Sequence, residues 1–383
     1  MAFQPSVLDE DLQLLQKTAR EFADGVLAPA AARVDREERP AWENWKAIAD
    51  MGFLGFLVPE EHGGTGLGNL ALAVVLEEIN RACASTGVAV SVQNSLIAGP
   101  LVKYGTDAQK RKYLPRLVGG DLIGAYAISE PEHGSDAAAL ETRAEKKGAA
   151  YILDGRKAWI TNGASAGLII VFATVDRTLG AKGITAFLVD AKTPGISVGK
   201  HEKKLGIRGS ETVEIVFENV EVPADAVLSS VGSGFRLAMD TLDGGRIGIA
   251  AQATGILAAC LNDSVQYSKE RRQFGKPIAD FQPIQWKIAA MGLDLEMARL
   301  LVRQAASLRD AGVPHSRQAS MAKLHASEAA NRAATQAVQI HGGAGYLKDF
   351  AVERYYRDAK ITEIYEGTSE IQRLVIARSL LGT

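Results

Sequence analysis

The chain has 383 residues, of which 47% are hydrophobic and 23% charged, and its formal net charge is -2. This length predicts about two or three packed domains, and the composition excludes a disordered or membrane-embedded chain. The near balance of charges excludes a strong overall attraction to nucleic acid or to an anionic membrane.

The cysteines and the N-terminus bear on location. Cys83 and Cys260 are the only cysteines, too few for a disulfide framework, which is typical of a reducing compartment. The N-terminal residues lack the basic-then-apolar layout of a signal peptide, and the longest apolar run, around Leu168 to Val175, is too short to span a bilayer. We expect a cytoplasmic protein with no membrane helix.

The first part of the chain has the spacing of amphipathic helices. Between residues 8 and 120, apolar side chains recur three and four positions apart. Breaks are expected at Pro40, at the glycine cluster of residues 63–68, and at residues 105–107, where an Asp can cap the next helix. The pattern predicts four or five helices.

From about Ile123 the pattern changes to short runs rich in β-branched and aromatic residues, such as GLIIVFATV and TVEIVFENVEV. No long helical pattern separates these runs, so an antiparallel barrel or sandwich is favoured over a parallel sheet. Helical spacing then returns in long segments, roughly 234–268, 280–311 and 317–340, which is typical of a helix bundle.

Together these patterns predict an α+β fold with three domains. They are an N-terminal helical domain (residues 1–122), a middle antiparallel β domain (residues 123–230) and a C-terminal helical bundle (residues 231–383).

Several common cofactor signatures are absent from the sequence. No GxxxxGK[ST] loop occurs, and no GxGxxG follows a strand and opens a helix. The glycines of residues 64–68 are too compressed for that motif and are typical of a turn. No HExxH occurs, and no Glu-x-x-His pair lies between residues 234 and 340, as a di-metal bundle would need. We expect neither a Rossmann nucleotide site nor a metal.

Four polar and glycine-rich segments stand where the periodicity breaks, at residues 126–136, 158–163, 339–346 and 364–370. Loops on a rigid scaffold are where functional sites tend to lie. Each segment alone is also typical of ordinary structure: a capped turn, a core Trp, a helix C-cap and a solvated loop glutamate.

In this order, however, the segments resemble the acyl-CoA dehydrogenase family. AISEPEHGSD and QIHGGAGYLKDFAVERYYRD are similar to its signature stretches, and EIYEGTSEIQR is similar to its catalytic loop. The segments LDGGRIGIAAQATGI and ERRQFGKPI extend the resemblance over nearly the whole chain, most closely to the short-chain (butyryl-CoA) branch. The resemblance implies a four-helix C-terminal domain and FAD-dependent α,β-dehydrogenation of an acyl-CoA to the trans-2-enoyl-CoA. It also implies electron-transfer flavoprotein as the electron acceptor, and a homotetramer built as a dimer of dimers.

The resemblance also implies the site residues. Ser129 and Thr161 would hydrogen-bond the flavin ring, while the adenine and pyrophosphate of FAD would be reached from a neighbouring subunit by Arg271, Phe274, Gln282 and residues 339–343. The full implied cofactor set is Tyr126, Ile128, Ser129, Gly134, Ser135, Trp159, Ile160, Thr161, Arg271, Phe274, Gln282, Gln339, Gly342, Gly343, Thr368 and Glu370. The implied substrate set is Ser135, Asp243, Arg246, Tyr365 and Gly367. The resemblance favours a CoA-binding role for Asp243 and Arg246, although their spacing is also compatible with a simple intrahelical ion pair.

By the same resemblance, Glu366 is the catalytic base that removes the α proton. Its own backbone N–H and an FAD ribityl hydroxyl would stabilise the developing enolate. Isovaleryl-type relatives carry the base at the position of Gly245, which has no side chain here, so Glu366 is the only matching base. An apolar pocket would raise its pKa and strengthen it as a base.

The substrate remains open at this level. Glutaryl-CoA relatives carry an arginine where Gly87 stands, so a dicarboxylyl substrate is disfavoured. A short acyl chain is favoured, with a branched- or medium-chain acyl-CoA as alternatives, because pockets discriminate weakly between neighbouring chain lengths. A non-catalytic CoA-thioester or flavin binding protein is the other class considered.

Overall fold

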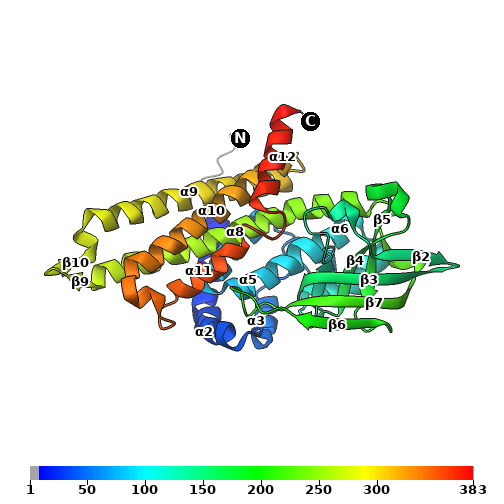
Figure 1. Cartoon of the computed structure of the whole chain (residues 1–383), viewed down its shortest axis with the longest axis horizontal. Coiled ribbons are helices and arrows are strands. Elements are labelled where there is room, and N and C mark those ends of the chain that lie inside the picture. The colour runs from blue at the N-terminus through cyan, green and yellow to red at the C-terminus, as the bar shows by residue number, and fades with distance from the viewer. Residues whose placement is uncertain (1–7, 383) are drawn as a thin grey trace.

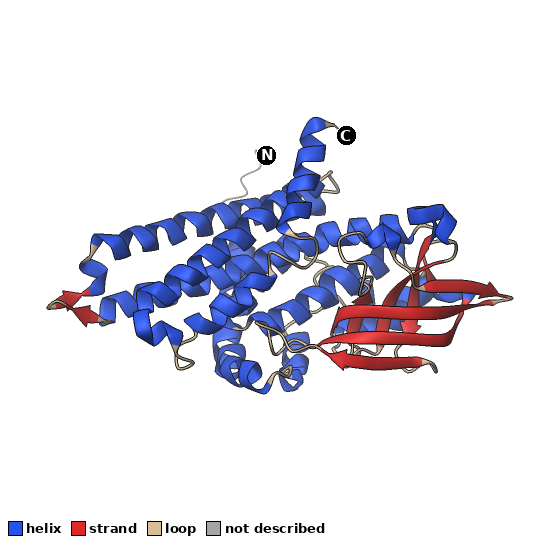
Figure 2. Ribbon diagram, in the orientation of Figure 1, coloured by secondary structure: helices blue, strands red, loops and turns tan. Residues whose placement is uncertain are grey.

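The computed structural model describes residues 8–382. Figure 1 shows an elongated molecule with a β part at one end, long helices that extend to the other end, and N-terminal helices packed alongside. Figure 2 shows how the strands gather in one region, apart from a short ribbon at the far end of the bundle. The predicted α+β arrangement is therefore confirmed. The domain boundaries at residues 122 and 230 stay a prediction.

The N-terminal part forms five continuous helical segments between residues 8 and 120, within the predicted number. They are α1 (Glu10–Phe22) joined by a π-helical turn (Ala23–Leu27) to α2 (Ala28–Glu37), α3 (Trp45–Asp50), α4 (Gly68–Ala82), α5 (Ala84–Ser91) joined by a π-helical segment (Val92–Ala98) to α6 (Gly99–Tyr104), and α7 (Asp107–Val118). The breaks predicted at Pro40, 63–68 and 105–107 all fall at helix ends.

One predicted detail is wrong, because Thr106 rather than an Asp caps α7. The backbone of Thr106 is extended, so its hydroxyl accepts from the Gln109 N–H at 3.2 Å, and the Gln109 side chain accepts from the Thr106 N–H at 3.0 Å. This reciprocal pair satisfies two donors at the helix start. Asp107 lies inside the first turn, where its negative charge suits the helix dipole.

The middle part is an eight-stranded sheet in the order β6-β7-β3-β2-β4-β5-β8, with β1 paired to β4. The strands are β1 (Gly124–Ala127), β2 (Arg143–Lys147), β3 (Ala150–Thr161), β4 (Leu168–Thr174), β5 (Ile184–Asp190), β6 (Ile196–His201), β7 (Thr212–Pro223) and β8 (Val227–Leu228). Most pairs are antiparallel, as predicted, but β1 runs parallel to β4, and β2 also meets β4 in parallel at one position. The sheet is therefore mixed. Parallel strands need a long connection, and the connection between β1 and β4 contains the β2–β3 hairpin.

Strand β4 is buried along its whole length because both of its faces are covered. Leu168, Ile170 and Phe172 belong to the core shared with the helices, whereas Ile169 and Val171 belong to a second core within the β part. Successive side chains of a strand point to opposite faces, so one continuous apolar run serves two cores. The sheet is in this way fixed rigidly against the helices that carry the rest of the site.

The C-terminal part is a bundle of four helices with a fifth helix leaving it. These are α8 (Gly234–Glu270), α9 (Gln282–Asp310), α10 (Ser316–His341), α11 (Val352–Ile361) and α12 (Ser369–Leu381), with the ribbon β9 (Arg272–Gln273) and β10 (Lys276–Pro277) between α8 and α9. The three long segments match the predicted ranges closely. Helix α12 starts against α10 and projects from the body of the molecule (Figure 1).

Helix α8 is the central helix of the molecule. Among the described residues it is the one helix long and apolar enough to cross a membrane, but 94% of its most apolar window is buried inside the protein. It packs against α4, α9 and α10. A helix that is apolar on all sides and covered by other helices is typical of a protein core.

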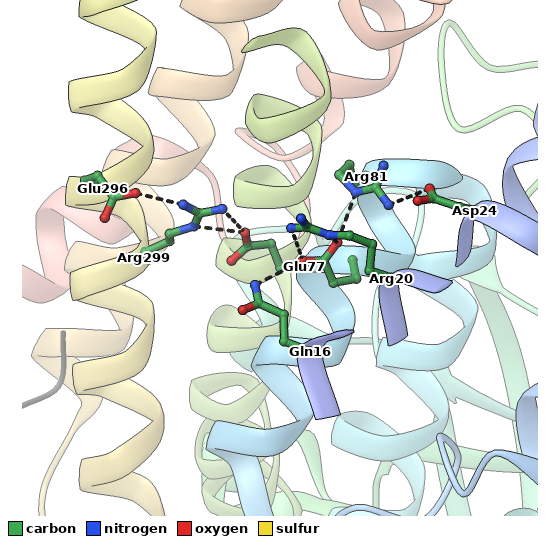
Figure 3. Close-up of polar contacts among 8 residues, drawn as sticks. Gln16, Arg20, Asp24, Glu77, Arg81, Glu296 and Arg299 are labelled. Atoms are coloured by element: carbon green, nitrogen blue, oxygen red, sulfur yellow. Dashed lines mark hydrogen bonds and ion pairs between the residues drawn. The ribbon is translucent and has the colours of Figure 1, made fainter. Parts of the chain in front are cut away.

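Two adjacent glutamates of α4 connect the N-terminal helices to the bundle (Figure 3). Glu77 accepts from Arg299 of α9 at 2.7 Å, and Glu78 accepts from Arg20 of α1 at 2.8 Å and from Arg81 at 3.0 Å. Both carboxylates are buried. Because breaking a buried pair leaves an uncompensated charge, this network fixes α4 between its neighbours.

Candidate active site

Glu366 lies in the turn between α11 and α12, in a conformation that few non-glycine residues adopt. Its φ is 53°, and that of Gly367 is 92°, so two consecutive residues are left-handed. Thr368 follows with an extended backbone and caps α12 through its hydroxyl. A left-handed non-glycine residue costs free energy unless its surroundings enforce it, and such residues cluster at functional sites.

The surroundings that enforce this turn are two side chains from different helices. The Gly367 carbonyl accepts from Lys323 Nζ of α10 at 2.6 Å and from Gln372 Nε2 of α12 at 2.8 Å. No described acceptor receives the backbone N–H of Glu366. The turn is thus held through the Gly367 carbonyl, and the Glu366 N–H stays available to a ligand.

The Glu366 carboxylate lies over Gly245 of α8. A Cβ built on Gly245 would overlap Oε2 of Glu366 and lie 2.9 Å from the carboxyl carbon. Oε2 is buried and has no hydrogen-bond partner among the described residues. Burial raises the pKa of Glu366 to about 7, although the positive charges of Lys323 and Arg246 act to lower it. A buried carboxyl whose pKa lies near neutrality is a candidate general base.

Two phenols flank this carboxylate. The Tyr365 hydroxyl hydrogen-bonds the side chain of Gln252, and the buried Tyr126 hydroxyl has no hydrogen-bond partner among the described residues. Burial, and then the nearby charge of Glu366, raise the pKa of both phenols well above the usual value. Both therefore stay neutral and can contact a ligand without adding charge.

Asp243 and Arg246 form an ion pair of 2.6 Å within α8, and the Ser316 hydroxyl donates to Asp243 at 3.0 Å. The intrahelical pair that the sequence left open is therefore present. The Nε of Arg246 is nevertheless buried without a partner, so part of the guanidinium remains unsatisfied. Such an orphaned charged donor is suited to an anionic or carbonyl ligand.

The segments 126–136 and 158–163 meet at one edge of the sheet. The Ala158 N–H donates to the Ser129 carbonyl at 3.0 Å. Trp159 is left-handed, with φ 58°, and its side chain is 51% exposed. No described hydrogen bond uses the hydroxyls of Ser129 or Thr161. An exposed indole beside free hydroxyls fits a planar ring ligand that carries polar edges, which is the chemistry of a flavin.

A buried ion pair supports this edge. Lys157 Nζ contacts Glu130 at 2.8 Å and donates to the Ile128 carbonyl at 3.1 Å. Glu130 also accepts from the N–H groups of Glu141, at 2.5 Å, and Thr142, at 2.9 Å. Burial lowers the pKa of Lys157 to about 8. Burial acts to raise the pKa of Glu130, but the charge of Lys157 and the hydrogen bonds to Glu130 outweigh burial, so the pKa of Glu130 is lowered. Both groups are therefore charged at neutral pH.

The remaining predicted residues lie elsewhere in the chain. Arg271 caps the C-terminus of α8 directly before the β9–β10 ribbon, Phe274 lies in the turn of that ribbon, and Gln282 begins α9 just beyond it. Residues 339–343 reach the same end, because Tyr267 near the end of α8 stacks on His341 at 4.1 Å between ring centroids. Figure 1 shows this end opposite the β part, so a single chain does not bring the two cofactor sets together.

A third group flanks the start of α12. Thr368 and Glu370 line a polar cavity of about 590 Å³ that helices α10 and α11 also border. The predicted cofactor residues therefore fall into three places: the sheet edge, the far end of the bundle, and this cavity.

Four polar residues that bear on the site were given no role by the sequence analysis: Glu130, Lys157, Gln252 and Lys323. All four are buried. The available signal was a lysine or glutamine at a position that helical or strand periodicity makes apolar, as Lys323 stands among the buried alanines of α10. Buried charges occur rarely unless they are paired or functional.

Gly87 lies on α5, where it packs against the side chain of Asn80. A Cβ built there would overlap the side chain of Asn80. An arginine at this position would therefore need the Asn80 side chain to move.

Comparisons with known proteins place this geometry in a family. The descriptions "Acyl-CoA dehydrogenase, N-terminal domain", "middle domain" and "C-terminal domain" match residues 9–121, 125–220 and 232–381. The mitochondrial short-chain specific acyl-CoA dehydrogenase of Bos taurus is 51% identical over 379 residues, which cover 99% of this chain and 92% of that protein.

Two solved structures match over the full length of both chains. One is butyryl-CoA dehydrogenase from Megasphaera elsdenii, with 43% identity and a TM-score of 0.96. The other belongs to a study of the electron transferring flavoprotein of Acidaminococcus fermentans, with 44% identity and a TM-score of 0.97. Family members are FAD-dependent oxidoreductases that act on acyl-CoA thioesters. The chain therefore belongs to the acyl-CoA dehydrogenase family.

Proposed function

We propose that the chain desaturates a short-chain acyl-CoA thioester, with Glu366 as the base that removes the α proton. The observation that carries this proposal is the buried, unpartnered carboxylate over Gly245, with its pKa near 7. A base whose pKa lies near the working pH combines a useful ionised fraction with a useful affinity for the proton. Bound FAD supplies the hydride acceptor for the β carbon.

The turn that carries Glu366 also supplies a hydrogen-bond donor. The available N–H of Glu366 suits the thioester carbonyl oxygen, where negative charge develops as the α proton leaves. Tyr126 and Tyr365 exclude water from the carboxylate without adding charge, which strengthens every electrostatic interaction there. One residue thus contributes both the base and an oxyanion donor, fixed to each other by the left-handed turn.

A short acyl chain is supported by the side of α8 that faces the base. Gly245 admits the carboxylate of Glu366, Gly248 admits the side chain of Ser91 from α5, and Gln252 follows about two turns after Gly245. Gln252 is fully buried and is held by Tyr365 and by the Ala84 carbonyl. Lengthening the pocket would require breaking these buried hydrogen bonds, which is costly. The bovine relative is described as short-chain specific.

The two distant cofactor sets support a proposal about assembly. We place the flavin at Ser129, Trp159 and Thr161, and the rest of FAD against Arg271 and Phe274 of a neighbouring subunit. Phe274 is 92% exposed and left-handed, with φ 52°, which is unusual for a side chain that serves its own subunit only.

Helix α9 offers a surface for that assembly. It carries an exposed apolar stripe at helical spacing, formed by Trp286, Leu293, Met297 and Leu300. We propose a homotetramer, built as a dimer of dimers, in which such surfaces are covered. Light scattering of the purified protein tests this, and a monomer that retains FAD would contradict it.

The enzyme hands its electrons on to electron-transfer flavoprotein, the protein named in one of the similar structures. We further propose a cytoplasmic enzyme that needs no membrane. Reduction of added electron-transfer flavoprotein by the substrate-reduced enzyme is the direct test of this partner.

The base assignment is tested with Glu366→Gln, and Glu363→Gln in the same loop is the matched control. Both proteins are purified and titrated anaerobically with acyl-CoA thioesters of rising chain length. We expect both to be yellow and to bind butyryl-CoA, but only the control to bleach. Bleaching of Glu366→Gln at the normal rate would refute the assignment, and a wild type that binds but never bleaches would instead indicate a silent binding protein.

A further inference from the structure

Lys323 is a buried lysine that no feature of the fold explains by itself. Its side chain has 0% exposure, and it forms no ion pair within 4 Å among the described residues. Its one described hydrogen bond, of 2.6 Å, goes to the carbonyl of Gly367. Burying an unpaired ammonium is costly, and an apolar residue of similar length would fill the space without that cost. A charge is therefore retained here for a purpose other than packing.

The position of the ammonium indicates that purpose. Gly367 directly follows Glu366, both residues are left-handed, and the Gly367 carbonyl belongs to the peptide that joins this turn to Thr368. Lys323 approaches from α10, while Gln372 approaches the same carbonyl from α12 at 2.8 Å. One peptide group is thus held from two sides. Of the two donors, only Lys323 carries a charge.

The other charges around Glu366 do not duplicate this role. Arg246 of α8 also faces the carboxylate, but Asp243 pairs with it at 2.6 Å and offsets part of its field. The remaining neighbours that can titrate are two neutral phenols, Tyr126 and Tyr365, and two glutamates, Glu363 and Glu370, whose negative charges favour the charged form of Lys323. Among the described residues, Lys323 is therefore the cation that acts on the Glu366 carboxylate without belonging to an ion pair.

We propose that Lys323 is a positioning residue for the base, which holds the Glu366–Gly367 turn through the Gly367 carbonyl and presents an unpaired positive charge to the Glu366 carboxylate. This inference deepens the proposed function and rests on Glu366 being the base. Two consequences follow from it: loss of the charge alters the protonation of Glu366, and loss of the hydrogen bond alone alters only its position.

The direction of the first consequence follows from the electrostatics. Lys323 is the foremost influence that lowers the pKa of Glu366, and Glu366 in turn favours the charged form of Lys323, whose pKa burial brings down to about 8. Removing the ammonium removes an attraction for the ionised carboxylate, so the pKa of Glu366 must rise.

The experiment compares Lys323→Met with Gln372→Met in the FAD-loaded enzyme. Each change removes one donor to the Gly367 carbonyl, but only the first removes a charge. The rate constant of anaerobic flavin reduction by butyryl-CoA is measured against pH. We expect the pKa in the Lys323→Met profile to rise by about one unit or more, and that of Gln372→Met to stay at the wild-type value. Superimposed profiles of Lys323→Met and wild type would overturn the proposal.

A second readout needs no turnover. The infrared band of the protonated Glu366 carboxyl, assigned by its loss in Glu366→Gln, is titrated with pH in each variant without substrate. The same upward shift is expected in Lys323→Met, and no shift there would refute the proposal. If Lys323→Met does not fold, Lys323→Gln keeps a donor without the charge and must show the same shift. Should Glu366→Gln retain turnover, the base assignment fails, yet the infrared titration still decides the role of Lys323.

Discussion

The carboxylate of Glu366 and the backbone of Gly245 occupy adjoining space, with no room for a side chain between them. Oε2 of Glu366 stands where a Cβ of residue 245 would be. Two elements separated by more than a hundred residues therefore define one position for the carboxylate. The site therefore requires a glycine at position 245 of α8 as well as the glutamate at position 366.

Replacement of Gly245 by alanine is expected to displace this carboxylate. The new methyl group would also approach Leu96 Cδ2 at 3.0 Å, so it cannot move away easily. We predict normal FAD content and a fall of about 100-fold in the rate of flavin reduction by butyryl-CoA, because small misplacements of a reacting group are costly.

Gly292→Ala is the matched control for that change. Gly292 also lies in a long helix, but no atom stands within 4 Å of its added Cβ. This variant should show wild-type rates and slightly higher stability, since alanine favours a helix by about 1 kcal/mol over glycine. Equal rates in the two variants would mean that Gly245 does not set the carboxylate position.

The pH dependence of the reaction should report the raised pKa of Glu366, which burial brings to about 7. The base acts only when ionised, so the rate of flavin reduction should rise with pH below about 7 and level off above it. Stopped-flow measurements with butyryl-CoA check this. A profile that is already flat from about pH 5 upward would show that the carboxyl is not perturbed.

The free energy of unfolding should fall with rising pH over the range in which the reaction rate rises, because both depend on the ionisation of Glu366. Because the pKa in the folded protein exceeds the unfolded value, the stabilisation by the protonated carboxyl is complete at low pH and is lost as the pH rises through about 7. We predict that Glu366→Gln raises the melting temperature at pH values above 7 and has little effect near pH 5. Calorimetry at both values tests this, and a lower melting temperature at the higher pH would be inconsistent with it.

The Glu130–Lys157 pair should support flavin binding as well as stability. Lys157→Met leaves the Glu130 carboxylate buried without its cation, which costs about 3 to 5 kcal/mol in comparable sites. We predict a lower melting temperature and a lower FAD content, because Ile128 and Ser129 lose their anchor. Restoration of both properties by excess FAD would show that the pair acts through this segment, whereas unchanged FAD content would refute the link.

The buried network of α4 should give the protein part of its resistance to acid (Figure 3). Burial would raise the pKa of Glu78, but hydrogen bonds from Arg20 and Arg81 outweigh it and lower that pKa. Its stabilisation is therefore present above the unfolded pKa and is lost as the pH falls through the folded value.

Glu78→Gln is expected to lower the free energy of unfolding by about 3 kcal/mol at neutral pH, and by less in acid. The control is Glu21→Gln, which removes an exposed ion pair with Lys17 within α1 and should cost less than about 1 kcal/mol. Urea unfolding at two pH values measures both. Equal effects of the two changes would contradict a special role for the buried network.

Much of this protein follows from local properties of its sequence. The periodicities located the helices of both ends and the β part between them, because the faces of helices and strands repeat at fixed spacings. The segment that contains Glu366 could be identified from its residues and their order. The prediction of an Asp cap at residues 105–107 failed, and Thr106 caps α7 instead, because the capping residue is the one whose backbone is extended at the helix start.

The tertiary structure decided what surrounds those residues. No local pattern shows that Gly245 leaves the space for Glu366, that Lys323 and Gln372 hold the same carbonyl, or that β1 lies parallel to β4. These relationships join positions that are distant in the chain, and they depend on how helices and strands pack. The perturbed pKa of Glu366 has the same origin, since burial and the charges that offset it come from different helices. The sequence by itself determined the order of helices and strands and indicated the candidate site residues, and the packing determined the environment in which those residues lie.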